Sequence, residues 1–468
     1  MKRNLFLLLG IIVFLLSGCI LAPKYERPNA PVPAEWPTGA AYNEPKSAAS
    51  APAATELMWR EFITDKRLQK IIETALNNNR DLRLAALNVE RAQALYGISR
   101  AALLPSVSAV GMMSKQLVPA DLSTTGSAMT ATQYSVNLGI SSWEIDFFGR
   151  IRSLKDQALE EYLATDQARR SAQIMLVSAV AQAYLSLAAD REALKLVAST
   201  LDTQEASYKL IRKRQDVGLA SELDIRRAQT QVDIAKVDVA RYTQLVAQDD
   251  NTLNLLAGSP MLQELLPADL VSVSPPKEVS PGLSSEVLLR RPDVLAAEHR
   301  LKAANANIGA ARAAFFPRIS LTAAIGTASA DLSGLFKSGQ GVWSFAPQII
   351  MPIFDARTWS AYDVTKVEKE ISLAQYEKAI QTAFREVADA LAVQGTVNQQ
   401  IAAQQSLVDA VAETYRLSNA RYTKGIDSYL SVLDAQRSLY GAEQGLIALR
   451  LARINNVVVL YKALGGGE

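Results

Sequence analysis

Two very long segments of the chain repeat apolar residues every three or four positions. Residues 151–217 and 358–424 each run for 67 positions without a proline. The spacing is illustrated by Leu176, Ala179, Ala183 and Leu187. This periodicity predicts amphipathic helices, and their length is typical of coiled coils rather than of globular helices. At 1.5 Å per residue, each helix would be about 100 Å long.

Each long segment ends at a glycine, Gly218 or Gly425, and a second helical pattern follows it. We expect turns at these two glycines, with helices that run back to Gly258 and Gly465. The sequence therefore predicts two long helical hairpins with tips near residues 218 and 425.

Two other stretches alternate apolar residues with small or polar ones. In 134–141 and in 318–325 every second residue is apolar or aromatic. Period-two alternation predicts strands with one apolar face. Ser/Thr/Gly-rich links at 119–132 and 329–341 indicate exposed loops, so each stretch belongs to a strand pair.

The chain contains an internal repeat of about 200 residues. RAALLPSVS at 100–108 recurs as RAAFFPRIS at 312–320, an offset of 212 positions. RQDVGLASELDIRRAQ at 214–229 aligns with RYTKGIDSYLSVLDAQ at 421–436, an offset of 207 positions. Two copies of one unit therefore make up most of the chain.

These patterns divide the chain into consecutive segments. They are a signal peptide (1–18), an extended N-terminal segment (19–63), a helix (64–104), strand pair 1 (105–147), hairpin 1 (148–258), a linker (259–283), a second helix (284–316), strand pair 2 (317–357) and hairpin 2 (358–464).

Four amphipathic strands per chain imply that the chain associates with further chains. A lipid-exposed sheet with free edges leaves backbone groups unsatisfied, and four strands cannot close into a barrel. We therefore expect several chains to share one transmembrane β-barrel. A soluble β-sandwich is the alternative that the strand pattern alone leaves open.

The N-terminus is typical of an exported protein. Lys2 and Arg3 precede an apolar run that is too short to span a bilayer, and LSGC ends at Cys19. An ordinary signal peptide with a chance cysteine is one interpretation. However, LSGC resembles the bacterial lipobox, which implies cleavage before Cys19, an S-diacylglycerol and an N-palmitoyl group on that residue. Pro-rich sequence then favours an extended tether.

Composition argues against catalysis and nucleic acid. The chain has 49 Lys and Arg residues against 47 Asp and Glu, so no nucleic-acid partner is expected. One His and one Cys exclude a zinc site, a disulfide within the chain and a Cys–His nucleophile pair. We expect no cofactor beyond the lipid and no enzyme activity, and we interpret His299 as structural.

WEIDFFGRIRS (143–153), VGLASELDIRRAQ (217–229), the duplicated RAALLPSVS and RAAFFPRIS, and RYTKGIDSYLSVLDAQRS (421–438) resemble the TolC family of outer-membrane efflux proteins. The resemblance spans almost the whole chain and is greatest to the OprM-like lipoprotein branch, which serves RND pumps. It implies an α+β homotrimer, with a twelve-stranded β-barrel in the outer membrane continuous with a periplasmic helical barrel. It also implies a periplasmic adaptor (membrane fusion protein) and an inner-membrane RND pump as partners.

The resemblance also places a gate at the hairpin tips. It implies pore rings of Leu430 and Asp434, with Arg437 nearby, and a tether between Tyr422 and Asp224. Three Asp434 carboxylates at one constriction would attract cations, and three Leu430 side chains would gate the pore by dewetting. Core packing for Leu430, and a solvated acid or a pair with Arg437 for Asp434, are the alternatives. This chain departs from some members of the family at Asp427, where they have arginine, and at Ser431, where they have a second pore acid.

Four functions compete at this point. The sequence favours a passive exit duct of a drug or solvent efflux system, because Cys19 indicates a lipid anchor. A duct for type I protein secretion is the second interpretation. A periplasm-spanning scaffold leaves the alternating strands unexplained, and a lipid-anchored enzyme lacks a catalytic cluster.

Overall fold

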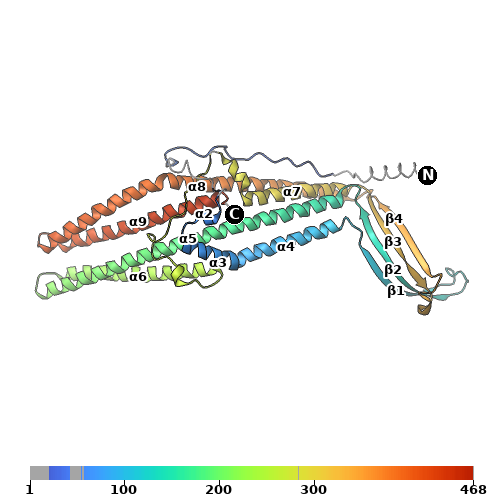
Figure 1. Ribbon diagram of the computed structural model, residues 1–468, viewed down its shortest axis with the longest axis horizontal. Coiled ribbons are helices and arrows are strands. Elements are labelled where there is room, and N and C mark those ends of the chain that lie inside the picture. The colour runs from blue at the N-terminus through green and yellow to red at the C-terminus, as the bar shows by residue number, and fades with distance from the viewer. Residues whose placement is uncertain (1–20, 43–53, 55–56, 283, 467–468) are drawn as a thin grey trace. The chain divides into compact units, whose positions relative to one another are not determined.

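The computed structural model describes residues 21–42, 54, 57–282 and 284–466 (Figure 1). The chain divides into two compact units. Unit 1 contains the described residues up to Pro28, Asn88–Thr165 and Ala296–Tyr376. Unit 2 contains the described residues of Asn29–Leu87, Asp166–Leu295 and Glu377–Glu468. The predicted signal peptide and Cys19 lie outside the described residues.

Helices and four strands alternate along the described chain. The helices are α2 (Trp59–Phe62), α3 (Lys66–Asn78), α4 (Arg80–Ala101), α5 (Arg150–Asp216), α6 (Glu222–Ala257), α7 (Pro292–Ala313), α8 (Ala356–Thr423) and α9 (Tyr429–Ala463). The strands are β1 (Val107–Val118), β2 (Met129–Ile145), β3 (Arg318–Ser329) and β4 (Gly341–Ile350). Short 3₁₀ turns occur at Gln263–Leu265, Ser285–Arg290 and Leu332–Gly334.

The four strands of unit 1 form one antiparallel sheet in the order β1-β2-β3-β4 (Figure 1). Each strand pair is a hairpin within one repeat. The two repeats meet between β2 and β3, where Leu138 pairs with Ile325 and Gly139 with Ala324. β2 begins at Met129, so the link between β1 and β2 is shorter than the sequence pattern predicted.

The sheet has one apolar face. Residues directly opposite each other in a ladder share a face, and Ile319, Leu321, Ala323 and Ile325 lie opposite Ile349, Pro347, Phe345 and Trp343. The Trp343 and Phe345 side chains are 80% and 63% exposed. The other face carries mostly polar or small residues, as in the Ser320–Gln348 and Ala324–Ser344 pairs. The alternation predicted from the sequence is present in the folded sheet.

A β-bulge keeps this apolar face continuous along β2. The register shifts between Ile140 and Trp143, so these two residues face the same side although they are three positions apart. Ser142 has a positive φ of 51° at the bulge, and its backbone N–H donates to the Thr322 hydroxyl at 3.2 Å.

Close contact between the two repeats requires glycine. A Cβ atom on Gly326 would lie 2.1 Å from the Val136 carbonyl oxygen, and one on Gly139 would lie 2.4 Å from the Ala323 oxygen. Glycine at both positions lets β2 and β3 pair at normal spacing.

The helical segment expected over 64–104 is divided at Asn79. The backbone of Asn79 is extended (φ −61°, ψ 130°), and its side-chain oxygen accepts from the Leu82 N–H at 2.9 Å. Its amide nitrogen donates to the Leu256 carbonyl oxygen. Asn79 therefore ends α3 and caps α4, a contact between distant segments that helical periodicity does not reveal.

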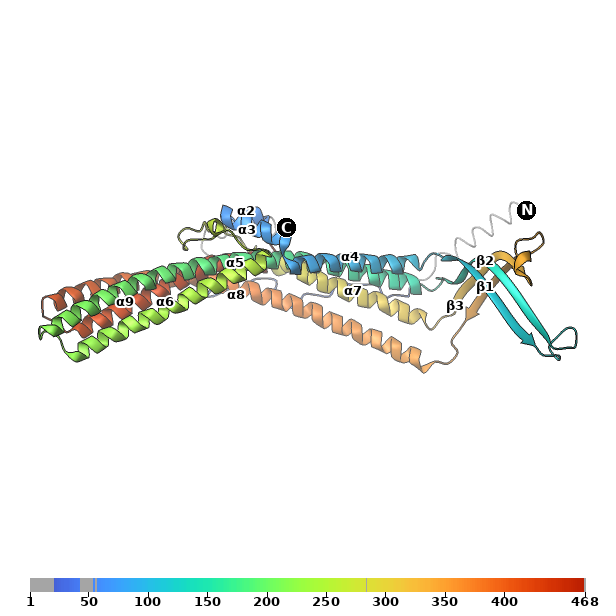
Figure 2. The same cartoon turned by 90° about the horizontal axis from the view of Figure 1, so that it is seen from below.

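The two long helices agree with their predicted bounds to within two residues. α5 and α8 contain 67 and 68 residues. In unit 2, the second half of each pairs with α6 or α9 to form a hairpin, and the hairpin tips lie side by side (Figure 2).

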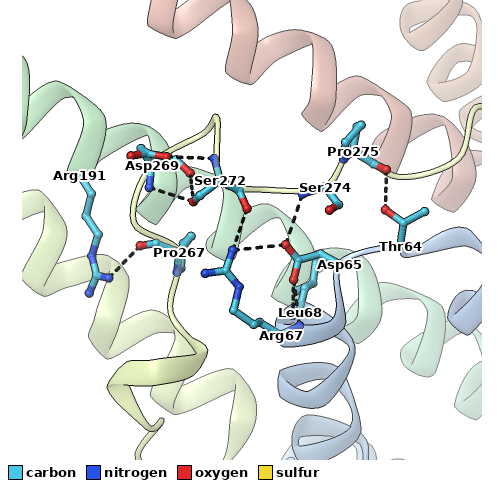
Figure 3. Close-up of polar contacts among 10 residues, drawn as sticks. All are labelled: Thr64, Asp65, Arg67, Leu68, Arg191, Pro267, Asp269, Ser272, Ser274 and Pro275. Atoms are coloured by element: carbon cyan, nitrogen blue, oxygen red, sulfur yellow. Dashed lines mark hydrogen bonds and ion pairs between the residues drawn. The ribbon is translucent and has the colours of Figure 1, made fainter.

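Residues 259–282 of the predicted linker are held within unit 2 by polar contacts (Figure 3). The buried Asp65 carboxylate caps α3 by accepting from the Arg67 and Leu68 N–H groups, and it also accepts from the Ser274 N–H. Arg67 donates to the Ser272 carbonyl at 2.7 Å, and Arg191 donates to the Pro267 carbonyl at 2.8 Å. These contacts join the described residues of the linker to α3 and α5 of unit 2.

Candidate functional site at the hairpin tips

Both hairpin tips use the same turn. Gly218 and Gly425 have left-handed φ values of 78° and 74°. The Leu219 N–H donates to the Arg214 carbonyl at 2.7 Å, and the Ile426 N–H donates to the Arg421 carbonyl at 3.0 Å. A side chain at either glycine would be strained, because L-residues rarely adopt this conformation. The internal repeat therefore extends to the geometry of the tips.

An aromatic and aliphatic cluster joins the two tips. It contains residues from all four helices of the two hairpins. The buried members are Ile211, Ile225, Ala228, Tyr429, Val432 and Leu433, and the partly buried ones are Tyr208, Ala220, Tyr415 and Tyr422. We refer to these residues as the tip cluster. It holds the hairpins together where the resemblance places a gate.

The predicted pore residues lie on α9 outside the tip cluster, and their side chains are exposed. Leu430 is 47% exposed, whereas its neighbour Tyr429 is buried. Asp434 lies one turn further along and accepts from Arg437 at 2.9 Å, with both side chains exposed. Leu430 and Asp434 are thus available to a partner or to a pore, with Arg437 partly neutralising Asp434.

Asp224 and Tyr422 are not hydrogen-bonded to each other in this structure. The Asp224 carboxylate accepts from the Ser221 N–H and hydroxyl at 3.1 and 2.7 Å, and forms a capping box at the start of α6. The Tyr422 ring instead lies next to Tyr429, with centroids 5.3 Å apart, and the Arg214 guanidinium carbon is 4.7 Å from its centroid. The Ser-x-x-Asp spacing of residues 221–224 is a sequence signal for this cap.

Two arginines at the tips, which match each other in the repeat, make contacts that the sequence did not predict. Arg421 donates to Asp427 at 2.6 Å through Nε and at 3.0 Å through Nη2, and it lowers the pKa of that exposed carboxyl. Arg214 occupies the equivalent position in hairpin 1 and contacts Tyr422. Their alignment at an offset of 207 was the signal that could have identified them.

Residues 21–28 pack on α7 in unit 1. Tyr25 and Arg27 both donate to the Glu298 carboxylate, and Lys302 lies 3.0 Å from the same group. Glu298 is 2% exposed. A Cβ on Gly309 would lie 2.8 Å from Ala22, so the chain passes directly over that helix. We refer to residues 21–28 as the strap.

The described part of the chain contains no group of three or more His, Cys, Asp or Glu side chains that could hold a metal ion. His299 lies in unit 1, where its Nδ1 is 2.6 Å from the Glu160 carboxylate.

An open sheet with one apolar face, together with long paired hairpins, is the architecture of a membrane duct. The chain belongs to the outer membrane efflux protein family, whose model matches residues 71–259 and 283–466. It is therefore a protein of the outer membrane that acts in efflux.

Individual relatives resemble the chain over almost its full length. The toluene efflux pump outer membrane protein TtgC and the antibiotic efflux pump outer membrane protein ArpC, both of Pseudomonas putida, are each 52% identical over 460 residues. The match covers 98% of this chain and 95% of each relative. The open state of the MtrE outer membrane channel of Neisseria gonorrhoeae has a TM-score of 0.85 and 39% identity, covering 96% of this chain and 98% of that one. The predicted family, fold and location are confirmed.

Proposed function

We propose that three copies of this chain form the exit duct of a tripartite RND-type efflux system. The open sheet carries this proposal. Its outer strands, β1 and β4, each have a neighbour on one side only, and the apolar face bears exposed Trp343 and Phe345. Three sheets would close a twelve-stranded barrel and satisfy these edges.

The duct is passive and receives its cargo from a periplasmic adaptor and an inner-membrane pump. TtgC and ArpC are named for toluene and antibiotic efflux. This supports organic solvents and antibiotics, rather than secreted proteins, as cargo. Cys19 carries the lipid anchor, and the strap then leads away from it along α7.

The gate of the duct lies at the hairpin tips. Leu430 and Asp434 lie one turn apart on an exposed face of α9. In a three-fold assembly each would form a ring. The Leu430 ring narrows the pore and repels water, and the Asp434 ring attracts cations.

Deletion of the gene, followed by growth on a panel of solvents and antibiotics, tests the transport function. We expect sensitivity to several compounds, restored by the full chain. The assembly is tested separately by the gel mobility of unheated and heated purified protein. Wild-type resistance to every compound would contradict efflux, and a monomer that does not shift on heating would contradict the shared barrel.

The adaptor is tested by photo-crosslinking from Leu219 and Ile426, which are 69% and 59% exposed at the tips. We expect both positions to capture a periplasmic protein in whole cells. A probe at exposed Glu370 on α8 is the control. Equal capture from all three positions would contradict a docking site at the tips.

A further inference from the structure

The two hairpin tips have the same backbone turn, but they differ at the position six residues beyond a shared arginine. Arg214 and Arg421 are equivalent in the repeat, and each accepts the turn hydrogen bond through its carbonyl oxygen. Six residues beyond Arg421 lies Asp427, which holds that arginine within hairpin 2 through two hydrogen bonds. Six residues beyond Arg214 lies Ala220. Hairpin 1 therefore lacks the acid that would hold its own arginine.

Arg214 reaches the other hairpin instead. Among the described residues no carboxylate lies within ion-pair distance of Arg214, and its guanidinium carbon is 4.7 Å from the centre of the Tyr422 ring on α8. Guanidinium groups within about 6 Å of an aromatic centroid are attracted to the ring face. Tyr429 packs on Tyr422 at 5.3 Å and is buried in the tip cluster, so the ring has a fixed position.

We propose that Arg214 and Tyr422 tie the two hairpins of one protomer together by a cation–π contact, and that Ala220 keeps Arg214 free to make it. The tie joins the last turn of α5 to the last turn of α8. The aromatic face of Tyr422 carries the contact, and the tyrosine hydroxyl is dispensable. Asp224 takes no part in this contact because Ser221 engages its carboxylate.

The role of the tie in gating rests on the proposed function, in which the hairpin tips form the gate of the duct. Hairpin 2 carries Leu430 and Asp434, so a tie to hairpin 1 restrains the segment that would line the constriction. Loss of the tie frees hairpin 2 to move away from the pore axis.

The decisive variant is Ala220→Asp, which alters neither partner of the tie. It recreates in hairpin 1 the acid of hairpin 2 and gives Arg214 a local ion pair. Ala220→Asn is the matched control because it has the same size without the charge. Tyr422→Phe keeps the ring and removes the hydroxyl, while Tyr422→Leu and Arg214→Gln remove one partner each.

Hydrogen–deuterium exchange of the full-length protein measures the tie directly. We expect severalfold faster exchange of peptides spanning 415–433 in Ala220→Asp, Arg214→Gln and Tyr422→Leu. Ala220→Asn and Tyr422→Phe should match the parent. High salt should reduce the effect of Ala220→Asp, because it screens the competing ion pair. Unheated gel mobility confirms that every variant is assembled as the parent is.

Three results would overturn the tie. They are equal effects of Ala220→Asn and Ala220→Asp, a Tyr422→Phe variant that behaves like Tyr422→Leu, and unchanged exchange in Arg214→Gln. Single-channel conductance of the same variants tests the gate separately. Faster exchange with severalfold higher conductance supports both proposals, whereas faster exchange with unchanged conductance supports the tie and contradicts the gate.

Discussion

The carboxyl groups of Asp190 on α5 and Asp249 on α6 lie close enough within hairpin 1 for each to shift the pKa of the other. Burial and the neighbouring Asp190 carboxyl raise the pKa of Asp249 to about 7, and Asp250 adds to the rise. Arg241 acts in the opposite direction on Asp190, and Arg191 lies 3.5 Å from Asp250. The pair favours a shared proton, since two adjacent carboxylates repel each other.

Because of this pair, we expect the free energy of unfolding to fall as the pH rises towards 7. The folded protein holds the proton more tightly than the unfolded chain, so the stabilisation is complete below the ordinary aspartate pKa and is lost through about pH 7. Asp249→Asn should therefore raise the thermal unfolding midpoint at pH 8 and leave it nearly unchanged at pH 4. One pKa unit corresponds to about 1.4 kcal/mol, and solvent screening at these half-exposed groups leaves about 1–2 kcal/mol.

Circular dichroism of the detergent-solubilised protein at both pH values measures the effect. Asp233→Asn, which changes an exposed aspartate on α6, is the control. An Asp249→Asn variant that melts below the parent at pH 8 would exclude repulsion in this pair.

Asp434→Ala should raise single-channel conductance and weaken cation preference, because it removes one carboxylate per chain from the proposed constriction. Glu413→Ala is the matched control, since Glu413 also forms an exposed ion pair with an arginine three residues on. Planar-bilayer recordings at low salt give both quantities. Unchanged conductance and selectivity would remove Asp434 from the gate.

Glu298→Gln should loosen the strap. Tyr25, Arg27 and Lys302 converge on the buried carboxylate, and charged hydrogen bonds of this kind contribute about 1.5–3 kcal/mol each. We expect cleavage by trypsin after exposed Lys24 to be about 10-fold faster, since cleavage follows the population of the open strap. Glu370→Gln serves as the control, and equal cleavage of the two variants would show that Glu298 does not hold the strap.

Cys19→Ser with an intact, cleavable signal should retain partial efflux activity. The apolar sheet face contacts the membrane, and the strap contacts α7. Neither contact depends on a lipid attached to Cys19. Growth on a graded series of antibiotic concentrations measures the remaining activity. Complete loss of activity in correctly assembled protein would show that the lipid has a role beyond sorting and assembly.

The long helices and the sheet could be predicted because apolar residues recur in the sequence at the spacing of a helix or of a strand. α5 and α8 follow proline-free apolar repeats, and β3 follows an alternation that its ladder partners share. The contacts of Arg214 and Asn79 could not be predicted in this way. Each joins segments that are about 180 or more residues apart, and each depends on side-chain direction rather than on spacing.

The pairing of β2 with β3 has an evolutionary consequence. β3 is the repeat counterpart of β1, and β4 is that of β2, so the contact between the repeats inside one chain is a template for the contact of β4 with β1 of the next chain. A half-length ancestor with one hairpin would have closed the same ring as a hexamer. Gly139 and Gly326 belong to the contact inside the chain, where a side chain at either position would meet the backbone of the facing strand.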